Sequence, residues 1–599
     1  MTEPHETGKR TEARELVVGI DFGTTNSEIA VFEEGQPQIL GEPLILPSVV
    51  GIDERGQLLV GEPARNQWIA FPERTIKSIK RRMGSRERIL LGEKEFRPSE
   101  IAAVILRQLK MNAEDQLGQP LRKAVITVPA FFSNAQRQAT FEAGELAGLE
   151  VVRMIHEPTA AALAYEAGHE GARKILVYDL GGGTFDVSVV DIQGDVIEVV
   201  SSHGNNRLGG DDFDRKIVEY LLRYLREQRS CDVRSDLKAM ARLWRAAETA
   251  KHHLSDHPFA VIEEAYLGER DGQPINLRVE LSRGQFDAMI SEEVEETLAA
   301  VHTALSDAAL KVTDIEEILL VGGATRTPLI QRRLEETFGM QPRAEVHPDL
   351  CVALGAAIQA GVLAGVDARA VLLDVTPYTF GTNAIQAETQ NAEGGDVHYF
   401  APIIRKNTPI PVTKSEVFCT VRDNQEEVEI KIYQGESPDV RENILIGDFT
   451  VTGLSQHPAG NLITVQLSLD CDGILEVTAT EKGTGTQRTL LIKNTMSRYE
   501  PDELAAARER IEALFRSGGN SEEEASESRE VTAEDVVLMA RLEGLVTRAG
   551  SLFKRVSRED AEDLHALLAG IRDAREGAQN AQLEALADQL ADLLYYLEA

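Results

Sequence analysis

The chain has 599 residues, 42% hydrophobic and 27% charged, so several globular domains are expected rather than one core. Its formal net charge of −35 argues against nucleic acid or an anionic membrane as the main partner. No apolar stretch is long enough to span a bilayer, and the four cysteines are too scattered for metal-ligand spacing, which favours reduced thiols in a cytoplasmic protein. Residues 1–15 are polar without an apolar signal core, so a disordered tail is expected.

One turn rich in Gly and Thr occurs twice. Segments 19–32 (GIDFGTTNSEIAVF) and 177–190 (VYDLGGGTFDVSVV) each run as an apolar strand, Asp-x-Gly, the turn and a second apolar strand. Gly lets backbone N–H groups approach phosphate oxygens, Thr adds hydroxyl donors, and the aspartate can hold Mg²⁺ through water. Two such turns facing each other would clamp a nucleotide between related lobes. The chain contains no G-x-x-x-x-G-K-[ST] motif, so this is not a P-loop.

Strand-like and helix-like segments alternate from about residue 16 to residue 369, which predicts α/β layers. VITVP (125–129) is typical of a buried strand, and EPTAAALAYEAG (157–168) of a helix with Pro at its first position. ILLVGGATRTPLIQRRL (318–334) predicts a strand, a Gly turn and a helix.

The pattern changes at AVLLDVTP (370–377), a short apolar segment without helical or alternating context of its own. Alternating segments at 428–433, 463–469 and 474–480 then predict a β-sandwich from 376 to 493. A helical period follows Tyr499, with apolar residues on one face and capping boxes at 532–535 and 557–560. The acidic stretch 517–530 is predicted to be a mobile loop between helices.

These features, together with HEPTAAALAY, RLGGDDFD, VGGATRTP, PDLCVALGAAIQAG and VLLDVTP, resemble the seventy-kilodalton heat-shock chaperones, the DnaK family. The resemblance implies a multidomain protein: an α/β two-lobed actin-like ATPase domain (16–369), an interdomain linker (370–376), a β-sandwich substrate-binding domain (377–497) and a C-terminal α-helical lid (498–599). The strings FAPIIRKNTPIPV and YQGE…ENILIGDF are more similar to the specialised HscC branch than to housekeeping DnaK.

The resemblance implies an ATP-dependent chaperone that binds and releases extended hydrophobic segments of unfolded proteins. Slow ATP hydrolysis would control the peptide-binding domain and the lid. The implied cofactors are ATP or ADP and Mg²⁺, with K⁺ as a further candidate. The implied partners are unfolded polypeptides, a J-domain co-chaperone and a nucleotide-exchange factor of open identity.

The resemblance also implies roles at the phosphates. Lys80 would position the attacking water, Thr184 would contact the γ-phosphate, and Asp21, Glu157 and Asp179 would hold Mg²⁺ largely through water. Lys80, Glu157, Asp179 and Thr184 are thus the implied catalytic set. The implied nucleotide contacts are Asp21, Gly23, Thr24, Thr25, Asn26, Gly181, Gly182, Gly183, Thr184, Gly209, Gly210, Asp211, Glu248, Lys251, Ser255, Gly322, Gly323, Arg326 and Asp349.

Each assignment has a plainer alternative. Without the resemblance, Lys80 would be taken for part of a solvated basic helix end, and Glu157 for a carboxylate that stabilises the start of a helix. Asp186 could be structural or part of the Mg²⁺ and water network. Glu248, Lys251 and Ser255 share one helical face, which could equally be an ordinary salt-bridged surface. Ala324 replaces a hydroxyl residue common in the family, so one adenosine hydrogen bond is expected to be missing.

Interdomain signalling is implied for two sets of residues. Pro129 and Arg137 match the family's ATP-sensing switch, in which Phe131 replaces the usual tyrosine. The linker residues are Val371, Leu372, Leu373 and Asp374, and Ala370 makes the linker one large apolar residue shorter than usual. The implied peptide groove comprises Ile385, Phe418, Val421, Val428 and Ile430, which taken alone would suggest only the core face of strands.

Two other functions fit a two-lobed nucleotide clamp. A small-molecule kinase would need a catalytic base in the cleft and would leave the linker, sandwich and lid unexplained. An actin-like filament protein would need no C-terminal substrate module.

Overall fold

The computed structural model describes residues 16–525, except for a few short segments, and beyond them only Leu567, Leu586 and Leu590. The segments outside the description are 167–170, 271–272, 344–346, 367–370, 391–395, 493–498 and 500. Residues 1–518 form one compact unit and residues 519–599 another. The predicted tail, Ala370 and both later capping boxes lie outside the described residues. None of the described helices is both long and apolar enough to cross a lipid bilayer.

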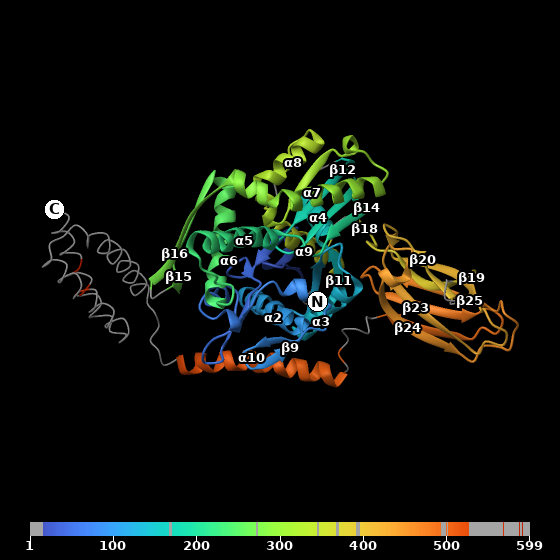
Figure 1. The fold of residues 1–599 in the computed structure, drawn as a ribbon. Helices are drawn as coiled ribbons and strands as arrows, with labels where there is room; N and C mark the ends of the chain where they lie inside the picture. Colours follow the sequence, from blue (N-terminus) through green and yellow to red (C-terminus); the bar gives the residue numbers. More distant parts are fainter. Residues whose placement is uncertain are drawn as a thin grey trace, which may run out of the picture. The chain divides into compact units, whose positions relative to one another are not determined.

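The first lobe is built on a mixed sheet with strand order β11-β10-β1-β2-β3. Figure 1 labels its strand β11. Its strands are β1 (Val17–Phe22), β2 (Asn26–Glu33), β3 (Gln36–Leu40), β10 (Lys123–Val128) and β11 (Glu150–His156), with β4 (Leu46–Pro47) beside β2. Helices α2 (Pro98–Leu117) and α3 (Asn134–Leu146) share a hydrophobic core with this sheet.

Small elements connect β4 to α2. They are β5 (Val50–Ile52), β6 (Leu58–Val60), α1 (Glu62–Gln67), β7 (Thr75–Ile76), the 3₁₀ turn η2 (Ile79–Arg82), β8 (Ile89–Leu91) and β9 (Lys94–Phe96).

The second lobe repeats the arrangement of the first. Its sheet has the order β17-β12-β13-β14, from β12 (Arg173–Leu180), β13 (Phe185–Gln193), β14 (Val196–Asn205) and β17 (Glu317–Val321). In both lobes the first strand pairs antiparallel with the second and parallel with a later strand. Asp21 faces Glu28 across one hairpin, and Asp179 faces Asp186 across the other. The predicted repeat is therefore present in the strand register.

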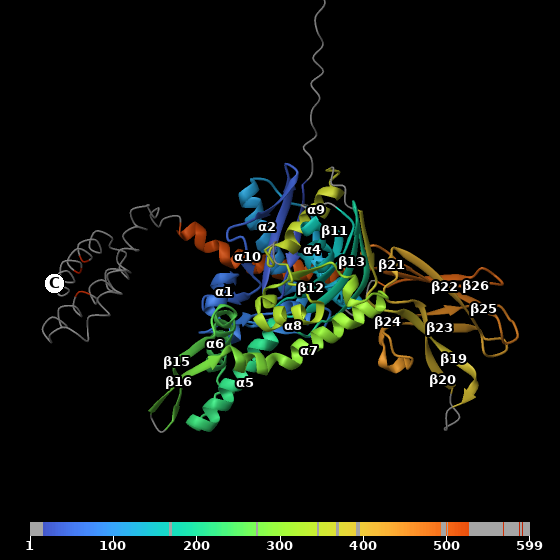
Figure 2. The same cartoon turned by 90° about the horizontal axis from the view of Figure 1, so that it is seen from above.

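Helices α5 (Gly210–Arg229), α6 (Leu237–Asp256), α7 (Arg283–Asp307) and α8 (Pro328–Phe338) pack with this second sheet. The hairpin of β15 (Phe259–Arg270) and β16 (Gln273–Ser282) lies beside α5 and α6 (Figure 2).

Two helices contribute to the core that joins the lobes: α4 (Glu157–Glu166) and α9 (Cys351–Leu363). The backbones approach so closely at Gly355 that a Cβ there would collide with the carbonyl of Ala160. Small residues at this crossing bring the two phosphate turns, which precede β2 and β13, to the same side of the molecule.

The linker is not an isolated segment. Val371–Val375 forms strand β18, which pairs parallel with β14 and antiparallel with β21 (Pro409–Ile410). It thereby extends the second-lobe sheet.

Two antiparallel four-stranded sheets follow and share one hydrophobic core, as the alternating pattern predicts. The first contains β19 (Phe380–Gln390), β20 (Asp396–Ile404), β23 (Glu427–Gln434) and β24 (Ile444–Thr452). The second contains β22 (Val412–Cys419), β25 (Leu462–Leu469), β26 (Leu475–Glu481) and β27 (Gln487–Ile492).

Helix α10 (Pro501–Ala525) corrects one expectation, because the stretch from residue 517 to 525 was predicted to be a loop and is helical. Glu522, Glu523, Glu524 and Ala525 are good helix formers, and Gly518 and Gly519 cost only about 1 kcal/mol each in a helix. The predicted apolar face is confirmed. Ala507, Ile511 and Leu514 are buried in the first-lobe core, with Leu504 and Phe515 at its edge.

Candidate functional site

The two Gly and Thr turns line a common cavity of about 90 Å³. Its walls include Asp21, Gly23, Thr24, Thr25, Asn26, Lys80, Glu157, Asp179, Gly181, Gly182, Thr184, Gly322, Gly323 and Asp349. The structure thus brings together most of the predicted phosphate residues. Gly209 packs against the backbone of Gly182 and Gly183, and the Gly210 N–H donates to the Gly181 carbonyl at 2.9 Å.

Lys80 is buried at 2% exposure and forms an ion pair with Glu157. Burial alone would lower the pKa of Lys80, but the carboxylates of Glu157, Asp21 and Asp179 outweigh it and raise that pKa. The alternative of a solvated helix end is therefore wrong. Its neighbour Arg81 reaches across the cleft to the Gly183 carbonyl at 3.1 Å and to Asp212.

The carboxylates around Lys80 outnumber the cation. Burial raises the pKa of Glu157 to about 8 and also raises the pKa values of Asp21 and Asp179. The Thr127 hydroxyl donates to Asp21 at 2.9 Å. This buried excess of acceptors fits a bound cation. The described part of the chain holds no group of three or more His, Cys, Asp or Glu side chains that could hold a metal ion directly.

Glu157 also lies in the first turn of α4, where its carboxylate can stabilise the start of the helix. Asp186 accepts a hydrogen bond from the Phe131 N–H at 3.1 Å. Burial raises the pKa of Asp186 to about 7. Asp186 therefore connects β13 to the segment that carries the predicted ATP-sensing switch.

A larger cavity of about 890 Å³ adjoins the phosphate turns. Glu248, Lys251 and Ser255 line it from α6, while Gly323, Arg326 and Asp349 line it from the opposite wall. Lys251 pairs with Asp214 at 2.8 Å, and Arg326 pairs with Asp349 at 2.8 Å. Ala324 also lines the cavity and supplies no hydroxyl.

Arg65, Asp214 and His252 are among the residues of this cavity that sequence reasoning missed. His252 follows Glu248 by one helical turn, a spacing that could have revealed it. Arg65 could not be found this way, because it comes from the first lobe and meets Glu248 at 3.3 Å across the cleft.

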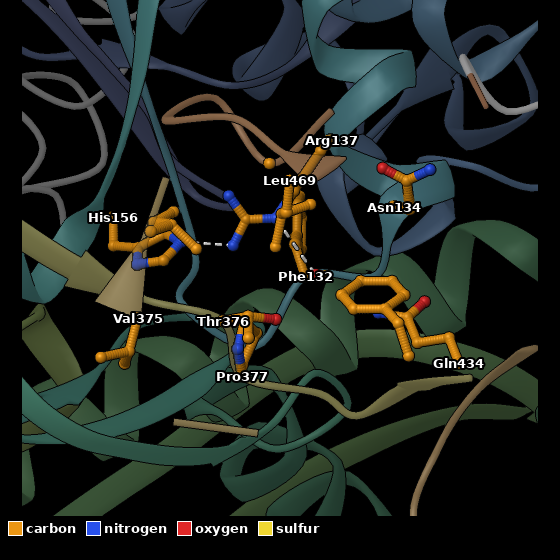
Figure 3. A pocket seen from close by; sticks show the side chains of 12 residues that line it. Phe132, Asn134, Arg137, His156, Val375, Thr376, Pro377, Gln434 and Leu469 are labelled. Carbon is orange, nitrogen blue, oxygen red and sulfur yellow. Dashed lines mark hydrogen bonds between the residues drawn. The ribbon is translucent and has the colours of Figure 1, made fainter. Parts of the chain in front are cut away.

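The predicted signalling residues meet at the linker. Arg137 donates to the Nε2 atom of His156 (Figure 3). The Nδ1–H of His156 donates to Asp374 at 2.7 Å. Burial lowers the pKa of His156, which keeps the ring neutral and able to accept from Arg137. The Thr159 hydroxyl also donates to Asp374, at 3.3 Å. Pro129 begins segment 129–137, which carries the predicted ATP-sensing switch, and its carbonyl accepts from the Phe132 N–H at 3.1 Å.

Phe131 lacks the hydroxyl of the usual tyrosine, and Tyr378 supplies one nearby. The Tyr378 hydroxyl donates to the Phe131 carbonyl at 2.7 Å, and the ring centroids are 4.6 Å apart. Asp472, in the turn before β26, accepts from the Met154 N–H at 2.9 Å. Sequence reasoning missed His156, Tyr378 and Asp472, since no local pattern marks contacts between distant segments.

The predicted groove residues lie at different depths in the sandwich. Ile430 is 5% exposed within the core, Phe418 and Val428 pack against that core, and Val421 is 46% exposed. Ile385 on β19 is half-buried. The peptide-groove assignment stays a prediction.

Comparison with known proteins supports the nucleotide reading. A family model described as Hsp70 protein matches residues 17–89 and 88–598. The chain belongs to the Hsp70 family. This Hsp70 is 47% identical over 504 residues to the chaperone protein DnaK of Thermotoga neapolitana, covering 82% of each chain. It is 41% identical over 592 residues to the DnaK of Thermosipho melanesiensis, covering 96% of this chain and 95% of that one.

Membership defines the activity. This Hsp70 is a DnaK-type ATP-dependent chaperone and an ATPase that binds ATP and ADP. The kinase and filament alternatives are set aside. The relatives reported above are DnaK proteins, and placement in the HscC branch stays a prediction.

Proposed function

We propose that this chaperone couples ATP hydrolysis between its lobes to the opening and closing of its β-sandwich on extended hydrophobic peptides. The observation that carries the proposal is the position of the linker. Strand β18 belongs to the second-lobe sheet, and its Asp374 is tied through His156 to Arg137. A change in lobe angle at the nucleotide can therefore reach the sandwich through one continuous set of contacts.

In the proposed hydrolysis, Thr24, Thr25 and the backbone of Gly181, Gly182 and Gly183 bind the phosphates. Lys80 orients the attacking water and offsets charge on the transferring phosphoryl oxygens. Thr184 contacts the γ-phosphate. Asp21, Asp179 and Glu157 would hold Mg²⁺ largely through water, and the ion would neutralise phosphate charge when bound. Glu248, Lys251, Ser255, Arg326 and Asp349 would hold the nucleoside.

The peptide would bind as an added strand, with an apolar side chain in a pocket formed by the predicted groove residues. In the state that would release peptide, α10 is docked on the first lobe and the linker is docked on the second-lobe sheet. A J-domain co-chaperone and an exchange factor are proposed partners, from the likeness to DnaK proteins. A cytoplasmic location stays a prediction.

The test is single-turnover ATP hydrolysis with and without an extended hydrophobic peptide. We expect slow hydrolysis that the peptide accelerates and that Thr184→Ala reduces by about 100-fold or more. Leu372→Asp should remove the peptide effect, because Leu372 packs on the core that joins the lobes. Leu90→Asp is the matched control, since Leu90 is 59% exposed on β8, outside the linker and its sheet. Equal effects of the two substitutions would contradict coupling through the docked linker.

A further inference from the structure

Both tryptophans of the chain line one cavity next to the predicted nucleotide site, with which it shares Thr24, Thr25, Asp211 and Glu248. The cavity has a volume of about 240 Å³ and lies beside Thr24 and Thr25 of the first phosphate turn. Trp68 caps the C-terminal end of α1 in the first lobe, and Trp244 comes from α6 in the second. Pro47 and Val49 complete its apolar wall. The site therefore forms only where the lobes meet.

The four cations that line this cavity already have partners. Arg65 and Lys77 contact Glu248 at 3.3 and 4.0 Å, and the Lys77 ammonium also lies 3.9 Å from the centre of a Trp68 ring. Arg81 and Arg215 both pair with Asp212. An anionic ligand would have to displace one of these carboxylates, so the cavity disfavours anions.

One buried acceptor in the cavity wall is left over. Asp214 is 4% exposed, and its Oδ2 accepts a hydrogen bond from Lys251 at 2.8 Å. Its Oδ1 has no hydrogen-bond partner within the described structure. A buried carboxylate oxygen without a donor is costly, and a ligand N–H would remove that cost. The cavity therefore lacks a hydrogen-bond donor for the Oδ1 of Asp214. The two indole rings favour a flat apolar or cationic group.

We infer that this inter-lobe cavity is a binding site for a small planar aromatic amine or amidine. The ring would lie against Trp68 and Trp244, and the N–H groups would face Asp214. A volume of about 240 Å³ admits one substituted ring and excludes a second nucleotide. Because the walls come from both lobes, a bound ligand would oppose their separation and slow ADP release. That consequence rests on the proposed nucleotide site, whereas binding itself does not.

The experiment uses the full chain saturated with ADP and two probes of opposite charge, benzamidine and benzoate. Tryptophan emission is followed in the wild type and in Trp68→Phe and Trp244→Phe, each of which leaves a single indole. We expect benzamidine to change the emission of both single-tryptophan variants saturably, at concentrations up to the order of 10 mM for so small a ligand. Benzoate should have no saturable effect.

Two further measurements locate the probe. Trp244→Ala should weaken benzamidine binding at least about tenfold, read from the remaining Trp68, without changing the affinity for labelled ADP. Labelled ADP should dissociate several-fold more slowly from the wild type when benzamidine is present. If binding is seen but release is unaffected, the effect on nucleotide exchange is overturned while the site stands.

The inference as a whole is overturned by any of three results. These are no saturable change with benzamidine, equal binding of benzoate, or competition between benzamidine and ADP, which would place the probe in the nucleoside cavity. None of these outcomes depends on hydrolysis or on peptide, so failure of this site and failure of the proposed coupling are distinguishable.

Discussion

Lys80 carries a buried positive charge, which costs desolvation free energy but would offset negative charge on the phosphates. It is the ammonium that balances Glu157, Asp21 and Asp179 in the phosphate cavity. Lys80→Met keeps the length of the side chain but removes the charge that would offset the transferring phosphoryl group. We expect single-turnover hydrolysis to fall by about 100-fold or more while ATP still binds.

The matched control for Lys80 is Arg82→Met. Arg82 lies in the same 3₁₀ turn but is exposed and pairs with Glu87 at 3.6 Å. Hydrolysis by the control should be close to that of the wild type. Unchanged hydrolysis in Lys80→Met, with ATP binding confirmed by a labelled nucleotide, would remove Lys80 from the catalytic set.

The raised pKa of Asp186 predicts that the free energy of unfolding depends on pH. Burial raises its pKa from an ordinary value near 3.8 to about 7, against opposing hydrogen bonds and the charge of Lys80. The folded state therefore binds this proton more tightly than the unfolded state. The resulting stabilisation is present at low pH and is lost as pH rises from about 4 through about 7, at ~1.4 kcal/mol per pKa unit.

Asp186→Asn should therefore make the melting temperature of the nucleotide-free protein less dependent on pH between about pH 5 and pH 8. The amide oxygen can still accept from the Phe131 N–H, so the local structure is retained. Asp195→Asn, in the exposed turn before β14, should keep the wild-type slope. Parallel slopes in all three proteins would show that Asp186 titrates at its ordinary pKa.

At the level of elements, helix α10 is held to the first lobe by two ion pairs, Arg510–Glu100 and Arg97–Glu503, as well as by its apolar face. Arg510 pairs with Glu100, which is fully buried and whose other oxygen accepts from the Arg97 N–H at the start of α2. Arg510→Ala would leave Glu100 buried without its cation, at a cost of about 3–5 kcal/mol. We expect α10 to separate from α2, seen as faster amide exchange in both helices.

Arg508→Ala is the control within the same helix turn, because Arg508 is exposed. Glu100→Gln combined with Arg510→Ala should restore most of the protection, since the amide keeps the α2 cap without a buried charge. Protection that is unchanged in Arg510→Ala would mean that the apolar residues and the Arg97–Glu503 pair hold α10 without Arg510.

The elements that could be predicted are those whose sequence signals lie close together in the chain. The two phosphate turns, the α4 and β17 segments and the sandwich strands each have a period or a turn signature within about 15 residues, and each was predicted from sequence. The burial of Lys80 was not predictable from composition, since its neighbours Lys77, Arg81 and Arg82 suggest a solvated segment. The family resemblance assigned it where periodicity could not.

Other features depend on residues far apart in the chain. Arg137, His156 and Asp374 come from α3, β11 and β18, and nothing in any one segment indicates that the three side chains meet. The same is true of Trp68 and Trp244. The loop predicted at residue 517 failed for a different reason. Its acidic, polar composition favours a loop, but the residues up to Ala525 continue α10.

At the scale of the molecule, the proposed coupling predicts that the two phosphate turns, the linker and the sandwich respond to ligands as one thermodynamic system. Asp472 contacts the Met154 N–H at 2.9 Å and Arg153 at 3.6 Å, and Lys406 contacts Asp307 at 2.8 Å. These polar contacts join the sandwich to both lobes. If ATP stabilises these contacts and peptide binding breaks them, each ligand must weaken the binding of the other by the same factor.

This reciprocity gives a quantitative prediction for Asp472→Asn in a Thr184→Ala background, where hydrolysis should not disturb the equilibrium. The amide still accepts from the Met154 N–H but loses its charge toward Arg153. The factor by which ATP weakens peptide binding and the factor by which peptide weakens ATP binding should fall together, by about two- to fivefold for a half-exposed pair. Both are measured by equilibrium titration with a labelled peptide and a labelled nucleotide. Asp448→Asn, on the exposed side of β24, should change neither factor. If only one factor changed, the two affinities would not report a single docking equilibrium, and the interface at Asp472 would act on the sandwich or the lobes alone.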